Sequence, residues 1–279
     1  MNLLVLFHFF LGNHHVIVSE PPKILYQYKT ANALKDIYID KNLIGTSEYD
    51  IKKSTFCTNI FKNGQKIKTL TWNSTAALEV FNEKEEMYRL DVLGKLNIYH
   101  IKNKTLNVWK AIYLDRQDFI TTACMDKNFI FSMSFYNSMF LTKDLETRRL
   151  SNEIYTRNFL YAKKIKISRF NDGPMNILIH FQKGGLLLIK ILIHQDLNDC
   201  NILQCSKILD CDNIKDFYFI TNFKIVCHLS TNILKIININ SLNIEKEIIL
   251  DGYISDIYVN DNKELYVYHS QKKKWVFYK

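Results

Sequence analysis

Residues 254–270, ISDIYVNDNKELYVYHS, carry the pattern that decides the fold of this chain of 279 residues. Runs rich in β-branched and aromatic residues lie on both sides of the polar segment NDNKE, which is typical of two strands joined by a turn. The stretch opens with the pattern apolar-x-Asp-apolar-Tyr-apolar. The rest of the chain repeats this pattern, so its spacing bears on the fold.

The same pattern occurs at residues 34–39 and 214–219, each time followed by a polar turn and a second apolar run. Looser versions begin near residues 76, 119 and 165. The six strands therefore begin at residues 34, 76, 119, 165, 214 and 254, so that successive starts are about 40 to 49 residues apart. This period is typical of the blades of a β-propeller.

The composition agrees with an all-β globular domain. Hydrophobic residues make up 47% and charged residues 23% of the chain, which excludes a disordered protein. Aromatic residues make up 13%, and no segment shows a long amphipathic helix pattern. We therefore predict one domain over residues 1–279, a β-propeller of six to seven four-stranded blades with seven favoured.

Two stretches resemble a known repeat family. Residues 254–270 resemble the first two strands of a WD40 blade, and residues 129–150 resemble the later strands, with a corner at residues 134–138. The chain is similar to a degenerate WD40-repeat propeller, which implies a non-catalytic scaffold for protein–protein interactions within a larger complex. It has no Trp-Asp dipeptide and no Gly-His pair. The family's hydrogen-bonded His-Ser/Thr-Asp-Trp network is therefore not carried over, except at Ser134 and Asn137.

The first 30 residues contain three further apolar runs. They predict either part of a first blade or a strand that closes the ring by pairing with the C-terminal strands, since an open edge invites aggregation. The run at residues 3–11 also resembles a signal h-region but lacks a basic n-region. It is too short to span a bilayer, so we expect no transmembrane segment.

The chain carries a formal charge of +9, which favours acidic partners or nucleic acid. Two basic clusters with nearby aromatic residues are candidate contacts for nucleic acid or an acidic partner. They are Lys163, Lys164, Lys166 and Arg169, and Lys272, Lys273 and Lys274. The structural interpretation is preferred at both, because Lys164 and Lys166 alternate with apolar residues as on a solvated strand face, and the second run fits a hairpin tip.

The aspartates of the recurring pattern are Asp36, Asp216 and Asp256. A functional interpretation is a ring of acidic groups on one face of the propeller. A structural interpretation is that each carboxylate accepts hydrogen bonds from a neighbouring loop or blade. Repetition at equivalent positions of the blades favours the structural role.

No catalytic, metal or cofactor site is expected. The chain has no catalytic motif, and Cys200, Cys205 and Cys211 are spaced too widely for a typical zinc site. The low cysteine count predicts a reducing compartment, the cytoplasm or the nucleus. Two alternatives to the scaffold remain: a basic propeller subunit that contacts RNA or DNA and, more weakly, a secreted or lumenal glycoprotein with sequons at Asn73 and Asn103.

Overall fold

The computed structural model describes residues 33–40, 43–114, 117–127, 129–143, 145–150, 161–169, 173–193, 200–209, 213–221, 223–230, 232–250, 252, 254–259, 265–269 and 274–278. These residues form 23 strands. No helix in this part of the chain is long and apolar enough to cross a membrane.

The strands form five four-stranded antiparallel sheets and one three-stranded sheet, each built from consecutive strands and called a blade here. Blade 1 consists of β1 (Ala33–Asp40), β2 (Leu43–Asp50), β3 (Thr55–Lys62) and β4 (Gln65–Trp72). Blade 2 consists of β5 (Ala76–Phe81), β6 (Glu86–Asp91), β7 (Lys95–His100) and β8 (Thr105–Lys110). Blade 3 consists of β9 (Ile120–Asp126), β10 (Phe129–Ser134), β11 (Met139–Lys143) and β12 (Glu146–Arg149).

The other three blades follow in chain order. Blade 4 consists of β13 (Ala162–Arg169), β14 (Met175–Phe181), β15 (Leu186–Ile193) and β16 (Cys200–Leu209). Blade 5 consists of β17 (Ile214–Phe219), β18 (Lys224–Leu229), β19 (Ile233–Asn238) and β20 (Asn243–Ile249). Blade 6 consists of β21 (Ile254–Val259), β22 (Leu265–His269) and β23 (Lys274–Tyr278).

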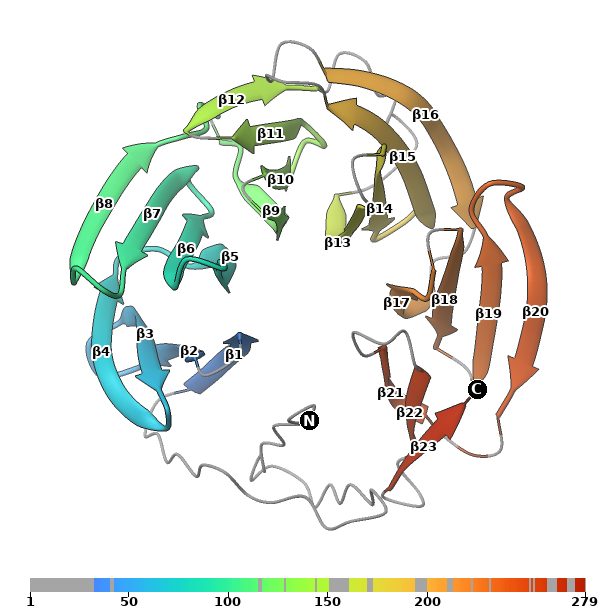
Figure 1. Cartoon of the computed structure of the whole chain (residues 1–279), viewed down its shortest axis with the longest axis horizontal. Helices are drawn as coiled ribbons and strands as arrows, with labels where there is room; N and C mark the ends of the chain where they lie inside the picture. Colours follow the sequence, from blue (N-terminus) through green and yellow to red (C-terminus); the bar gives the residue numbers. More distant parts are fainter. Residues whose placement is uncertain are drawn as a thin grey trace.

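The blades are arranged around a central axis, with the first strand of each blade innermost (Figure 1). These first strands begin at or within a few residues of the six positions that the repeat pattern predicts. The all-β propeller architecture is therefore confirmed. The seventh blade and the closing N-terminal strand were assigned to residues 1–30, which lie outside the described residues, and both stay predictions.

Each of the six first strands contains a register shift near its start, where one extra residue bulges out of the pairing with the second strand. The residues directly after the shift in blades 1 to 6 are Asp36, Leu78, Thr122, Lys164, Asp216 and Asp256. The three repeated aspartates thus share one position in their blades. Blade 4 has a lysine there.

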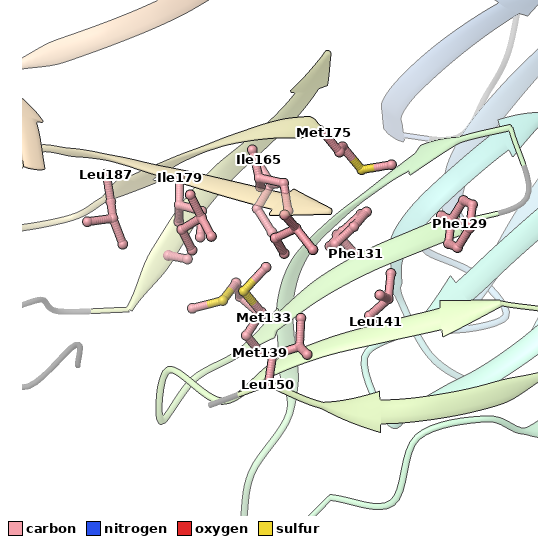
Figure 2. Packing of buried hydrophobic residues seen from close by; sticks show 14 of the residues in the cluster. Phe129, Phe131, Met133, Met139, Leu141, Leu150, Ile165, Met175, Ile179 and Leu187 are labelled. Carbon is pink, nitrogen blue, oxygen red and sulfur yellow. The ribbon is translucent and has the colours of Figure 1, made fainter. Parts of the chain in front are cut away.

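The hydrophobic core lies between the blades. Each cluster of buried side chains joins two neighbouring sheets, and the largest one packs blade 3 against blade 4. Figure 2 shows this packing, in which Phe131 and Leu141 of blade 3 and Ile165 and Ile179 of blade 4 belong to one cluster. The middle strands β10 and β14 are buried along their whole length, whereas the outer strands β8 and β20 are mostly exposed. Burial of apolar surface between the blades therefore stabilises the ring.

Candidate functional site

The first basic cluster lies on β13, the innermost strand of blade 4. Lys163 is exposed, whereas the side chains of Lys164 and Lys166 are 42% and 20% exposed. The predicted alternation holds, because Ile165 lies in the core between these lysines. The face that carries Lys166 is less solvated than the sequence predicts, since it approaches blade 5. Arg169 ends β13, and its side chain lies outside the described part.

Asp216 brings the two lysines together across the boundary between blades 4 and 5. The Lys164 ammonium donates a hydrogen bond to Asp216 Oδ1 at 2.8 Å, and Lys166 Nζ lies 3.2 Å from the same oxygen. The backbone N–H of Phe217 donates to this oxygen as well, at 2.7 Å. Lys166 Nζ also lies over the ring of Tyr218, 2.9 Å from its centroid. The cluster is an inter-blade ion pair of the kind that the structural interpretation of Asp216 describes.

Burial and charge shift the titration of both partners in this ion pair. Burial lowers the pKa of Lys166 to about 7, and the nearby Lys164 charge lowers it as well, although Asp216 opposes both effects. Burial alone would raise the pKa of Asp216. The charges of Lys166 and Lys164 and the hydrogen bonds from Lys164 and Phe217 outweigh it, so the pKa of this carboxyl lies below its ordinary value.

The remaining predicted site residues are placed only in part. Asp36 and Asp256 lie on β1 and β21, but their side chains lie outside the described part. Lys274 opens β23, and its side chain is likewise not described. Lys272 and Lys273 lie outside the described residues. The structure therefore brings Lys164, Lys166 and Asp216 together and leaves the other assignments as predictions.

The cysteines and the sequons are distributed over several blades. Cys200 is buried and Cys205 is exposed on the same strand, β16, while Cys211 lies outside the described residues. Within the described ranges, no group of His, Cys, Asp and Glu side chains could hold a metal ion. Asn73 and Asn103 are both exposed. Their exposure leaves the glycoprotein alternative open.

A buried polar network joins blades 1 and 2. The Trp72 indole N–H donates to Thr58 Oγ1 at 2.7 Å, and Thr58 Oγ1 donates to Glu79 Oε1 at 2.7 Å. Arg89 Nε donates to the same carboxylate oxygen at 2.9 Å, and the guanidinium lies over the Trp72 ring and donates to the Ser74 carbonyl. An indole, a hydroxyl and a carboxylate are therefore linked in this chain, although the WD40 motif residues are absent.

The Glu79–Arg89 pair of this network is almost completely buried, with side chains 4% and 1% exposed. Burial raises the pKa of Glu79, although the hydrogen bonds from Thr58 and Arg89 and the Arg89 charge act against it. The pair joins β5 to β6 within blade 2, and its contacts with Thr58 and Trp72 connect it to blade 1. Because neither charge faces solvent, the pair offers no binding surface. The sequence does not predict this pair, because its members lie on different strands and form no local motif.

The corner at residues 134–138 turns between β10 and β11. Ser134 is buried, and its Oγ accepts a hydrogen bond from the Ser138 N–H at 3.1 Å. Asn137 has φ 61°, the left-handed conformation that Asn tolerates well in turns. Both residues thus shape a tight turn, which projects the two residues between them, Phe135 and Tyr136, toward solvent.

Four aromatic residues, Phe119, Phe135, Tyr136 and Tyr161, form what we call the aromatic cluster. Phe135 stacks on Phe119 with ring centroids 5.1 Å apart and on Tyr161 at 5.5 Å, and it meets Tyr136 edge-on at 5.4 Å. Phe119, Phe135 and Tyr136 are 40%, 37% and 60% exposed. Such a group of large exposed aromatic side chains is typical of a binding surface.

Backbone hydrogen bonds hold the cluster at one end of blades 3 and 4. Phe119 lies directly before β9 and Tyr161 directly before β13, whereas Phe135 and Tyr136 lie in the turn between β10 and β11. The Phe135 N–H donates to the Phe119 carbonyl at 2.8 Å, so this turn lies beside the loop that enters the same blade. A rigid framework therefore presents loop residues, as binding sites commonly require.

The sequence predicts the corner at residues 134–138, which carries Phe135 and Tyr136, but it does not predict that this corner meets Phe119 and Tyr161. Phe119, Tyr161 and the turn with Phe135 and Tyr136 come from three separate loops, and only the pairing of the strands and the packing of the blades bring them together. The cluster could have been predicted from aromatic residues that lie directly before the first strand of a blade and in the turn between its second and third strands. This prediction would require the exact start and end of each strand in the blades.

No family model and no curated protein sequence matches the chain. Its fold does match solved structures. The WD40 β-propeller domain of Doa1 aligns with a TM-score of 0.57 at 9% identity, covering 86% of this chain and 76% of that one. BamB from Moraxella catarrhalis aligns with a TM-score of 0.52 at 11% identity, covering 90% of this chain and 84% of that one. At such low identity the likeness shows the fold alone, and that fold is a WD40-like β-propeller.

Proposed function

We propose that this propeller is a non-catalytic scaffold that holds other proteins in a larger complex, and that the aromatic cluster is one of its contact surfaces. The WD40-like propeller fold is of a kind that supports protein interactions, which makes a scaffold the first hypothesis for the chain. The exposure of Phe119, Phe135 and Tyr136 is the single observation that carries the proposal.

A protein partner accounts for this exposure. Aromatic side chains are enriched at protein–protein interfaces, and tyrosine is enriched among the few residues that carry most of the binding free energy. The cluster is held by backbone hydrogen bonds and by ring contacts within the cluster, so little conformational entropy is lost when a partner binds. The surface is therefore preorganised for binding.

Nucleic-acid binding receives less support from the first basic cluster. Lys164 and Lys166 are directed to Asp216, and Lys166 is mostly buried. Neutralisation of phosphates requires cations that face solvent, and of these three lysines Lys163 meets that condition best. The thiols of Cys57, Cys124 and Cys205 are free, which supports the proposal of a reducing compartment, the cytoplasm or the nucleus.

The experiment is quantitative affinity purification of the tagged protein from its native cells. It compares the wild type with the double variant Phe119→Ser/Tyr136→Ser and with Phe223→Ser, a control that removes an equally exposed aromatic ring, 52% exposed, from blade 5. We expect at least one stoichiometric partner to be recovered with the wild type and the control and to be lost from the double variant. Recovery of the wild type only as a free monomer would contradict the scaffold.

A further inference from the structure

The charges around the aromatic cluster indicate the chemistry of its partner. We propose that the cluster binds an acidic peptide segment of a partner protein, in which aliphatic or aromatic side chains alternate with carboxylates. This inference rests on the proposed function, because it assumes that the cluster is a protein contact surface. It adds the class of partner.

The exposed rings of the aromatic cluster are the reason to expect apolar side chains in the partner segment. Phe119, Phe135 and Tyr136 expose large carbon surfaces next to one another, and each gains free energy when water is removed from it. Tyr136 meets Phe135 edge-on, so its ring is turned relative to the stack of Phe119, Phe135 and Tyr161. A side chain of a partner that packs against Tyr136 and the stack would cover both.

The cationic side chains at the same end of blades 3 and 4 are the reason to expect acidic residues in the partner segment. Arg149 is exposed and donates to Ser138 Oγ at 2.6 Å, which places its guanidinium beside the turn that carries Phe135 and Tyr136. Lys163 is exposed two residues after Tyr161. Lys183 is exposed in the turn whose Gln182 N–H donates to the Tyr161 carbonyl at 3.1 Å.

A carboxylate, that of Asp118, lies next to the cluster. Asp118 directly precedes Phe119, and its Oδ1 accepts the backbone N–H groups of Phe119 at 2.9 Å and of Tyr136 at 3.4 Å. This side chain is half-buried and holds the two loops together. Among the described residues at this end of the blades, the exposed Lys163 and Lys183, with Arg149 beside the turn, outnumber this carboxylate, which favours a negatively charged partner.

An acidic peptide fits the cluster better than a single-stranded nucleic acid does. Base stacking requires an open ring face, whereas Phe135 at the centre already stacks on two rings and meets a third. A phosphate backbone also requires a continuous track of cations. The neighbouring lysines Lys164 and Lys166 are instead directed to Asp216.

The test is a fluorescence anisotropy titration of the full chain with labelled probes of equal length. The probes are a peptide of alternating acidic and apolar residues, the same peptide with lysines for the acidic residues, the acidic peptide with serines for the apolar residues, and a single-stranded oligonucleotide. The protein variants are Phe119→Ser/Tyr136→Ser, Lys163→Glu/Lys183→Glu and the control Phe223→Ser. If circular dichroism shows that Phe119→Ser/Tyr136→Ser does not fold, the single variant Tyr136→Ser takes its place.

We expect the acidic-apolar peptide to bind the wild type and Phe223→Ser equally, and to bind both other variants about tenfold more weakly. Its affinity should fall as salt is raised, because the cations are exposed. The inference would be overturned if the lysine peptide bound the wild type as tightly as the acidic-apolar peptide. It would also be overturned if the oligonucleotide bound more tightly than that peptide in a complex that depends on Tyr136, or if neither variant changed the affinity for the peptide.

The two proposals fail in different experiments. If the probes show no acidic preference but native partners are still lost from Phe119→Ser/Tyr136→Ser, the partner class is wrong and the contact surface stands. If that variant retains every native partner, the contact surface itself is wrong, whichever probe binds.

Discussion

Lys164 and Asp216 occupy the same position in the first strands of blades 4 and 5, directly after a register shift, and the lysine donates a hydrogen bond to the aspartate at 2.8 Å. The repeated position that carries an aspartate in blades 1, 5 and 6 thus carries its counter-ion in blade 4. In this pair, the aspartate of the repeat couples two neighbouring blades.

Replacement of Asp216 by Asn should destabilise the protein. The amide leaves Lys164 and the largely buried Lys166 without their counter-ion, and we expect the free energy of unfolding to fall by about 1–3 kcal/mol at neutral pH. The pKa of Asp216 lies below its ordinary value of 3.8, so the contribution of the carboxylate is present above that pH and is lost as the pH falls through the lowered pKa. Urea denaturation at several pH values checks this, and a constant difference down to strongly acidic pH would contradict it.

Lys166 should make the stability of the protein rise with pH above neutrality. It holds a proton in the unfolded chain up to about pH 10.5 but in the folded protein only below about 7. The unfolded state therefore binds more protons between these values, and stability increases there by at most about 1.4 kcal/mol per pH unit.

The measurement compares urea unfolding of the wild type with that of Lys166→Met across this window. The wild type should gain stability relative to Lys166→Met as the pH rises, while the exposed-lysine control Lys163→Met should follow the wild type. Parallel profiles of the wild type and Lys166→Met would show that Lys166 titrates normally.

The Glu79–Arg89 pair should be strongly coupled. Glu79→Gln and Arg89→Met each leave a buried charge without its partner, so each should lower the free energy of unfolding by about 3–5 kcal/mol. The double variant removes both charges and should lose much less than the sum of the two. A double-mutant cycle measures this coupling, and additive losses would mean that the two side chains do not interact.

Gly94 should not tolerate a side chain. Its φ is 80°, and a Cβ atom there would lie 2.5 Å from the Ile112 carbonyl oxygen, so Gly94→Ala combines backbone strain with a clash. Gly64→Ala is the control, because Gly64 has a similar φ of 78° in the turn between β3 and β4. We expect the control to lose about 1–2 kcal/mol of stability and Gly94→Ala to lose more. Equal midpoints of thermal unfolding would argue against the close approach of Ile112.

The repeat pattern predicts much of the fold because alternation has a direct physical cause. A strand buried on one side requires an apolar residue at every second position. After the bulge, the pattern meets this requirement at Phe217 and Phe219 of β17 and at Ile257 and Val259 of β21. Strongly apolar runs also mark the central strands, as at β14 and β15. Polar turns then separate the strands in chain order.

The candidate site is less predictable because it depends on contacts between separate hairpins. Tyr161 and Phe135 stack although they are far apart in the sequence, and no local spacing encodes that contact. The role of Lys166 illustrates the same limit. Alternation predicts its polar strand face, but only the packing of blade 5 reveals that the face meets Asp216 and Tyr218.

Hydrogen–deuterium exchange, measured on the free protein and on the complex purified from native cells, tests the aromatic cluster most directly. We predict that partner binding slows the exchange of backbone amides at residues 117–120 and 134–138, which carry Phe119, Phe135 and Tyr136. Unchanged exchange in both segments, together with protection at another surface of the propeller, would contradict the assignment of this cluster as the contact surface.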